Sequence, residues 1–126
     1  MSIIQNSSNL FIGTDIIEVN RIKDSIIKNG QRFLDRLYTP IEQKYCAKNK
    51  NSYVHFAGRF AAKEAIIKSL KSSGYKKEIP FSSIEIIPLE DGEPKVKLHF
   101  EHFGSCKVSI SHIKLYAIAF SIYTLN

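Results

Sequence analysis

The stretch from Arg59 to Ser69 reads as one helix that carries charged groups in an unusual place. At about 100° per residue, the apolar side chains of this helix form a single stripe. Lys63 falls inside the stripe and Glu64 lies at its edge, with Lys68 one turn further on. The stripe consists of Phe56, Phe60, Ile67 and Leu70, and the small residues Ala57 and Ala61 lie beside it. Alanines that flank a carboxylate and an ammonium leave room for a ligand to approach the helix backbone.

The same residues also have a structural interpretation. Glu64 and Lys68 are an i,i+4 pair of the favourable polarity, which stabilises an exposed helix by about 0.2–0.5 kcal/mol. Lys63 could lay its methylenes over the core and keep its ammonium in water. The helix alone therefore does not decide between a structural role and a ligand site.

Two other segments carry groups that can act together with this helix. Asp15 lies where a predicted strand gives way to a helix, which is a common place for a ligand-binding carboxylate, and His112 ends a later strand. Asp15 and Glu64 could together bind Mg²⁺, which prefers oxygen ligands and often keeps water or substrate phosphate in its other positions. Zinc fits poorly, because no cluster of His and Cys supplies its usual tetrahedral ligands.

The remaining reactive side chains lack a supporting motif. A lone His at the end of a strand is more often structural than catalytic, and we give His55, His99 and His102 that structural interpretation. Ser109 and Ser111 are not set in a G-x-S-x-G elbow, and no G-x-x-x-x-G-K-[ST] phosphate loop occurs. The sequence therefore does not support a serine nucleophile or a P-loop site.

Length and composition fit one globular domain over residues 1–126, with 44% hydrophobic and 24% charged residues. No apolar run reaches the roughly 20 residues of a transmembrane helix, and residues 1–9 do not resemble a secretory signal. The isolated Cys46 and Cys106 favour a reducing cytoplasm over a disulfide framework. The net charge of +6 favours an anionic partner, whether nucleic acid, phosphorylated metabolite or acidic protein.

The hydrophobic pattern predicts an α+β domain, with helices grouped in the first half packed on a mainly antiparallel sheet. We expect a strand over residues 10–17, a helix that stops at Asn29-Gly30, and a short helical turn over 33–37. Thr39 and Glu42 can form a capping box around Pro40, so the next helix begins there. The long helix is expected from about residue 53 to 71. Strands are expected over 84–88, 96–100, 106–111 and 115–123, with a turn at Asp91-Gly92.

Taken in chain order, several of these residues resemble the motifs of one family. The matching segments are Gly13-Thr14-Asp15, Phe33-x-x-Arg36-x-x-Thr39-x-x-Glu42, Ala57-Gly58-Arg59-Phe60-Ala61-Ala62-Lys63-Glu64-Ala65, Asp91-Gly92-x-Pro94 and Val108-Ser109-Ile110-Ser111-His112. Over about residues 12–119, the chain resembles the bacterial holo-[acyl-carrier-protein] synthases, which are small 4′-phosphopantetheinyl transferases. The third and fifth segments are specific together, whereas the Gly-x-Asp of the first is weak alone.

The resemblance implies an enzyme that transfers 4′-phosphopantetheine from coenzyme A to a serine of an apo-acyl carrier protein. It would release adenosine 3′,5′-bisphosphate and support fatty acid biosynthesis. The resemblance also implies the 4′-phosphopantetheinyl transferase fold, Mg²⁺ as cofactor, and a cytoplasmic homotrimer with active sites at the subunit interfaces. Neither nucleic acid nor a membrane is then expected as a partner.

The same resemblance assigns roles to individual residues. Asp15 and Glu64 would hold the metal, and Arg59, Lys68 and His112 would lie against coenzyme A. Arg21 matches a position that meets the acidic helix of the carrier protein. Lys63 joins Glu64 and His112 as a candidate catalytic residue.

The group that removes the serine proton stays open. Some relatives have Asp directly after the strand-end His, but this chain has Ile113, which excludes an Asp base at that position. Glu64, His112 and a metal-bound water are the alternatives. Thr14 is a second and milder departure, because relatives usually have an aliphatic residue there.

Two other classes of protein would also suit the positive charge. The charge and the aromatic residues Tyr75, Phe81 and Tyr116 suggest a small RNA- or DNA-binding module, but no RNP, KH or zinc signature occurs. A non-catalytic carrier-binding domain would use the same positive surface without metal chemistry. Neither class needs two acidic residues within a basic site, so Asp15 and Glu64 favour the transferase.

Overall fold

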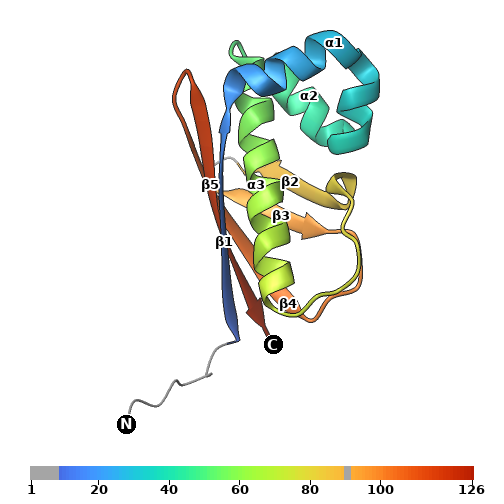
Figure 1. Ribbon diagram of the computed structural model, residues 1–126, viewed down its shortest axis with the longest axis vertical. Helices are drawn as coiled ribbons and strands as arrows, with labels where there is room; N and C mark the ends of the chain where they lie inside the picture. The colour runs from blue at the N-terminus through green and yellow to red at the C-terminus, as the bar shows by residue number, and fades with distance from the viewer. Residues whose placement is uncertain (1–8, 90–91) are drawn as a thin grey trace.

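The computed structural model describes residues 9–89 and 92–126, and it has the predicted α+β architecture (Figure 1). Its elements are β1 (Leu10–Glu18), α1 (Val19–Leu37), α2 (Pro40–Lys48), α3 (Ser52–Ser72), the 3₁₀ helix η1 (Phe81–Ser83), β2 (Ile84–Pro88), β3 (Pro94–Leu98), β4 (Gly104–His112) and β5 (Tyr116–Leu125). The strands form an antiparallel sheet in the order β1-β5-β4 and a separate β2-β3 hairpin. Helix α3 lies along one face of the larger sheet, while α1 and α2 gather near one end of α3 (Figure 1).

Small residues let α3 lie very close to this sheet. Ala61, Ala62 and Ala65 of α3 are fully buried against it. On β1, a Cβ atom added to Gly13 would overlap the carbonyl oxygen of Ala65, so the close approach requires glycine. Because side chains alternate along a strand, Asp15 shares the α3-facing side of β1 with Gly13. The packing of β1 therefore brings a carboxylate to the helix.

The opposite face of the larger sheet is apolar and exposed. Ile12 and Ile16 of β1 are 57% and 62% exposed, and Ile118 and Phe120 of β5 are 44% and 42% exposed. Ile16 pairs with Ile118 in the ladder, and Phe120 pairs with Thr14, so these side chains form one patch. Contiguous apolar surface of this kind commonly marks an interaction site. In the part of the chain that the structure describes, no helix is both long and apolar enough to cross a membrane.

The first two helices follow the local signals of the sequence. Helix α1 is interrupted at Gly30, whose φ of 57° and ψ of −138° are not helical, so the predicted stop and the later turn are two segments of one kinked element. Positive φ is readily adopted only by glycine. The predicted capping box at α2 is also confirmed. Thr39 Oγ1 accepts a hydrogen bond from the Glu42 backbone N–H, and Glu42 Oε1 accepts one from the Thr39 N–H.

Strand β3 differs from the prediction at both ends, and it begins at Pro94, two residues before the predicted start. Strand β3 stops at Leu98 instead of continuing to Phe100. Leu98 pairs with Ile84, the first residue of β2, and the chain before Ile84 forms η1, so Phe100 has no strand residue opposite it. Phe100 packs on Tyr75 instead, with ring centroids 5.3 Å apart. The predicted turn at Asp91-Gly92 includes Asp91, which lies outside the described residues.

Candidate active site

Asp15, Glu64 and Lys68 form one cluster where β1 meets α3. The Lys68 ammonium donates a hydrogen bond of 2.9 Å to the carbonyl oxygen of Thr14 and lies 3.5 Å from Asp15 Oδ1. The side chain of Asp15 is 18% exposed, whereas that of Lys68 is 55% exposed. Lys68 therefore binds β1 and holds a positive charge beside the Asp15 carboxylate, which differs from the simple Glu64–Lys68 pair of the structural interpretation.

Glu64 is half-buried in the same cluster. Burial raises the pKa of its carboxyl, the negative charge of Asp15 raises the pKa further, and the positive charge of Lys68 opposes both effects. The two carboxylates that the sequence placed on separate elements thus act on each other in the fold. The site carries more negative charge than Lys68 compensates, which is the condition that favours a bound cation.

The oxygens of Asp15 and Glu64 suit Mg²⁺, which needs few protein ligands when water and phosphate complete its coordination. Over residues 9–89 and 92–126, no group of three or more His, Cys, Asp or Glu side chains could hold a metal by itself. Glu64 also lines a groove of about 600 Å³, together with Phe33, Arg36, Phe60 and Glu78. A ligand in this groove could therefore meet the carboxylate directly.

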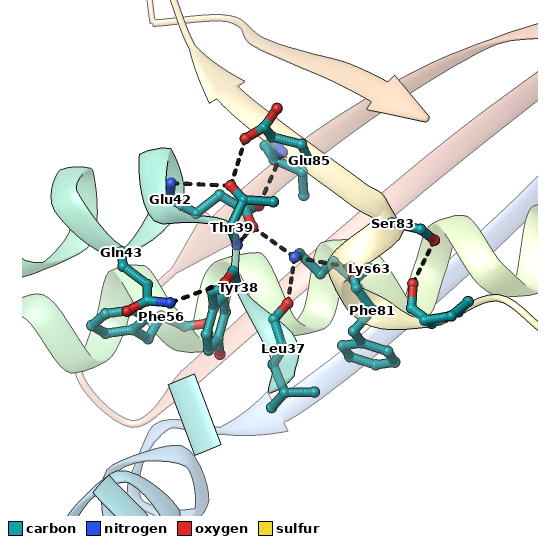
Figure 2. Close-up of polar contacts among 12 residues, drawn as sticks. Leu37, Tyr38, Thr39, Glu42, Gln43, Phe56, Lys63, Phe81, Ser83 and Glu85 are labelled. Carbon is teal, nitrogen blue, oxygen red and sulfur yellow. Dashed lines mark hydrogen bonds and ion pairs between the residues drawn. The ribbon is translucent and has the colours of Figure 1, made fainter. Parts of the chain in front are cut away.

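Lys63 makes its polar contacts with other residues than those of this cluster (Figure 2). Its ammonium is fully buried and donates to the Leu37 carbonyl at 2.6 Å, to Glu42 Oε1 at 2.7 Å and to the Phe81 carbonyl at 3.1 Å. Burial lowers the pKa of Lys63, and the nearby Glu42 carboxylate opposes that shift. An ammonium has three hydrogens, and three acceptors occupy them here. Lys63 thus does not extend to water, and these contacts give it a structural role, while its predicted catalytic role stays a prediction.

Arg59 and His112 meet in a second pocket, of about 220 Å³, between α3 and the end of β4. Arg59 is only 6% exposed, and its buried Nε has no hydrogen-bond partner. Its guanidinium carbon lies 4.4 Å from the centre of the Tyr45 ring, a cation–π contact. A buried cation with an unpaired N–H that lines a pocket is suited to an anionic ligand.

The structure places the other predicted residues as follows. His112 is exposed and lies against His55, a residue for which the sequence suggested only a structural role, with ring centroids 5.5 Å apart. Lys68 belongs to the acidic cluster, about two and a half helical turns beyond Arg59. Arg21 is exposed in the first turn of α1. Sequence reasoning missed Tyr45 and His55, although the i,i+4 spacing of His55 and Arg59 was a signal that they share a helix face.

Comparisons with known proteins agree with this fold. The family model described as the 4′-phosphopantetheinyl transferase superfamily matches residues 11–121. A protein named holo-[acyl-carrier-protein] synthase from Protochlamydia amoebophila is 44% identical over 120 residues, which cover 91% of this chain and 98% of that protein. A protein of the same name from Halothermothrix orenii is 44% identical over 119 residues, covering 88% and 94%.

Solved structures with the same fold include two complexes. The Chronobacterium ammoniagenes ACPS-CoA complex superposes with a TM-score of 0.81 at 25% identity, covering 93% of this chain and 98% of that one. A holo-(acyl-carrier-protein) synthase from Bacillus anthracis in complex with CoA (3′,5′-ADP) gives a TM-score of 0.76 at 33% identity, covering 92% and 96%. The chain therefore belongs to the 4′-phosphopantetheinyl transferase superfamily, in the group of the holo-[acyl-carrier-protein] synthases.

Proposed function

We propose that this protein transfers 4′-phosphopantetheine from coenzyme A to a serine of an apo-acyl carrier protein, and thereby supports fatty acid biosynthesis. The observation that carries the proposal is that α3 presents two complementary sites, the pocket with the unpaired Arg59 Nε and the acidic cluster at Glu64. These two residues point about 140° apart around the helix. Coenzyme A carries phosphates at more than one point along its length, so one molecule bound between two subunits could engage the cation of one subunit and the metal of the other.

The proposed cofactor is Mg²⁺, held by Asp15 and Glu64. Both residues offer oxygen ligands. Burial first, and then the negative charge of Asp15, raise the pKa of Glu64, and a bound cation would oppose both effects. When bound, Mg²⁺ would neutralise charge on the pyrophosphate of coenzyme A. Lys68 adds positive charge at the same place.

In the proposed reaction, the serine oxygen forms a bond to the β-phosphorus of coenzyme A. The bond from that phosphorus to the oxygen of the leaving adenosine 3′,5′-bisphosphate breaks, and the charge on the leaving group is stabilised by Arg59 and Lys68. Glu64 and His112 are the two side chains proposed to accept the serine proton. Lys63 takes a structural part in this scheme, because its ammonium is saturated by buried acceptors.

The proposed protein partner is an acidic acyl carrier protein that docks at α1. Arg21 is exposed there together with Lys23, Lys28, Arg32 and Arg36, and these basic residues outnumber Asp24 and Asp35, the exposed acidic residues of the same element. A surface with an excess of one charge attracts an oppositely charged partner and speeds its association, and this effect weakens with salt. The cluster therefore supports the role assigned to Arg21.

We further propose that the protein is a cytoplasmic homotrimer of single-domain subunits, with active sites at the interfaces. The exposed patch of Ile12, Ile16, Ile118 and Phe120 supports an assembly, because a second subunit would remove it from water. A head-to-tail contact that closes on itself gives a ring, in which each site can take residues from two neighbours. Free Cys46 and Cys106 fit a reducing compartment.

The direct test of the activity is to incubate the protein with coenzyme A, Mg²⁺ and a purified apo-acyl carrier protein. Mass spectrometry of the carrier should show a gain of one phosphopantetheine, with equimolar release of adenosine 3′,5′-bisphosphate. A carrier variant whose acceptor serine is replaced by alanine is the control and should gain nothing. A carrier of unchanged mass in the presence of saturating coenzyme A would contradict the proposal.

For the metal, we predict that Asp15→Asn and Glu64→Gln each lower the transfer rate at limiting Mg²⁺ by about a hundredfold or more. The pKa of Glu64 is higher in the folded protein than in the unfolded chain. As the pH rises above the pKa of the unfolded chain, ionisation of Glu64 therefore lowers the free energy of unfolding. Glu64→Gln should therefore unfold at no lower a temperature than the wild type at pH 7 without Mg²⁺. Added Mg²⁺ should raise the unfolding temperature of the wild type but not that of Asp15→Asn or Glu64→Gln.

Glu78→Gln is the matched control for this experiment, because it removes an exposed carboxylate from the same groove. We expect it to keep wild-type activity and the Mg²⁺-dependent rise in unfolding temperature. Full activity of either Asp15→Asn or Glu64→Gln at limiting Mg²⁺ would refute the metal assignment.

For the assembly, we predict that inactive Asp15→Asn and inactive His112→Ala subunits restore activity when they are mixed and allowed to exchange. If each site takes Asp15 from one subunit and His112 from the next, random mixing at equal amounts leaves about a quarter of the sites intact. A mixture of Asp15→Asn with Glu64→Gln should stay inactive, because both residues are expected from the same subunit. An active monomer in light scattering would end the proposal of shared sites.

A further inference from the structure

His55 lies in the Arg59 pocket, where the reaction as proposed above gives it no role. It comes from α3, one turn before Arg59, and its ring meets two others edge to face. The ring centroid of His55 is 5.5 Å from that of His112, at an interplanar angle of 71°, and 5.7 Å from that of Tyr45, at 89°. The pocket therefore holds two imidazoles and one guanidinium around a space of about 220 Å³.

Apart from Tyr45, the titratable and charged groups that face His55 are positive or able to become so. Helix α3 contributes Arg59, strand β4 contributes His112, and α2 contributes Tyr45, over whose ring the Lys48 ammonium also lies at 5.6 Å. Where β2 leads into β3, the described lining residues are Pro88, Leu89, Gly92 and Pro94, none of which is charged.

In the free protein, these surroundings disfavour protonation of His55. Burial lowers the pKa of His55, and the positive charges of Arg59 and His112 lower it further. At neutral pH the ring of His55 is therefore uncharged. A phosphate in the pocket would reverse this balance, because an anion within about 4–6 Å typically raises the pKa of a cationic group by 1–3 units.

We propose that His55 is a second anion-binding histidine of this pocket, and that it makes the affinity for coenzyme A rise as the pH falls. The inference rests on the proposed function, since it takes a phosphate of coenzyme A as the anion. In the bound state His55 is protonated over a wider pH range than in the free state. Affinity is thus highest at low pH and is lost as the pH rises through the interval between the free and bound titrations.

The test is the dissociation constant of coenzyme A, measured by isothermal titration calorimetry at pH 5.5 and at pH 8.5, for the wild type and for His55→Phe. Phenylalanine keeps an aromatic ring against Tyr45 and His112 but cannot be protonated. The phosphates of coenzyme A titrate in both proteins, so the pH dependence of the ratio of the two dissociation constants reports the imidazole of His55, including its contact with His112. On going from pH 8.5 to pH 5.5, we expect the affinity of the wild type for coenzyme A to rise about tenfold more than that of His55→Phe. This difference corresponds to a shift of one pKa unit in His55.

His102→Phe is the matched control, because His102 is a half-buried histidine in ring contact with Phe100 and Tyr123 and does not line the Arg59 pocket. The ratio of its dissociation constant for coenzyme A to that of the wild type should be the same at both pH values. A ratio for His55→Phe that does not change with pH would overturn the inference and leave His55 a packing residue. A wild type that binds coenzyme A at neither pH would overturn the proposed function itself.

A measurement on the wild type gives an independent check that does not depend on how His55→Phe folds. The ring proton resonances of His55 can be followed by NMR against pH, with and without saturating adenosine 3′,5′-bisphosphate. We expect the midpoint of the His55 titration to move up by about one unit when the ligand is bound. An unchanged midpoint in the presence of bound ligand would contradict the inference.

Discussion

The buried ion pair between Lys63 and Glu42 fixes the surroundings of α3. Their charged atoms lie 2.7 Å apart, and both side chains are fully buried. Glu42 also accepts the backbone N–H groups of Thr39 and Ile86, while Lys63 donates to the carbonyls of Leu37 and Phe81 (Figure 2). One pair of side chains therefore joins the end of α1, the start of α2, η1 and β2 to the long helix. Burying two charges costs several kcal/mol per ion, and only a complete set of hydrogen bonds of this kind offsets that cost.

This anchor explains how one helix can serve two different sites. Because Lys63 sets the rotation of α3, the next residue, Glu64, must point about 100° away from it, beside Asp15 of β1. Arg59 lies one turn before Lys63 and meets Tyr45 of α2, the helix that Glu42 holds in place. Gly13 completes the arrangement from the other side, since it allows β1 to approach Ala65. The Lys63–Glu42 pair and Gly13 thus position the site residues without contacting the ligand sites themselves.

What the sequence predicted well depends on signals between near neighbours. The capping box of Thr39 and Glu42, the break at Gly30 and the limits of the long helix follow from residues within one or two turns of each other, and all three are confirmed. The pairing of Asp15 with Glu64 joins residues far apart in the chain. The residue types alone suggested that these two carboxylates could share a Mg²⁺ ion, and the resemblance to a family assigned them that role.

What the sequence could not predict depends on partners that are distant in the chain. Lys63 could have extended to water on its own helix, and only the fold supplies Glu42 and two carbonyl acceptors at its buried position. Glu42 was recognised as a cap but not as a counter-ion. The importance of His55 arises from His112, which reaches it from a strand near the end of the chain. Strand β3 stops early because η1 replaces the strand residues that would have faced Phe100.

The most direct test of this account is a double-mutant cycle on the buried pair. The free energy of unfolding would be measured in urea, at one fixed protein concentration, for the wild type, Glu42→Gln, Lys63→Met and the double variant. Each single change leaves a buried charge without its partner, so each should lose about 3–5 kcal/mol. The double variant leaves no unpaired charge and should lose at least about 1 kcal/mol less than the sum of the two single losses. Single losses that add without coupling would contradict the claim that this pair anchors α3.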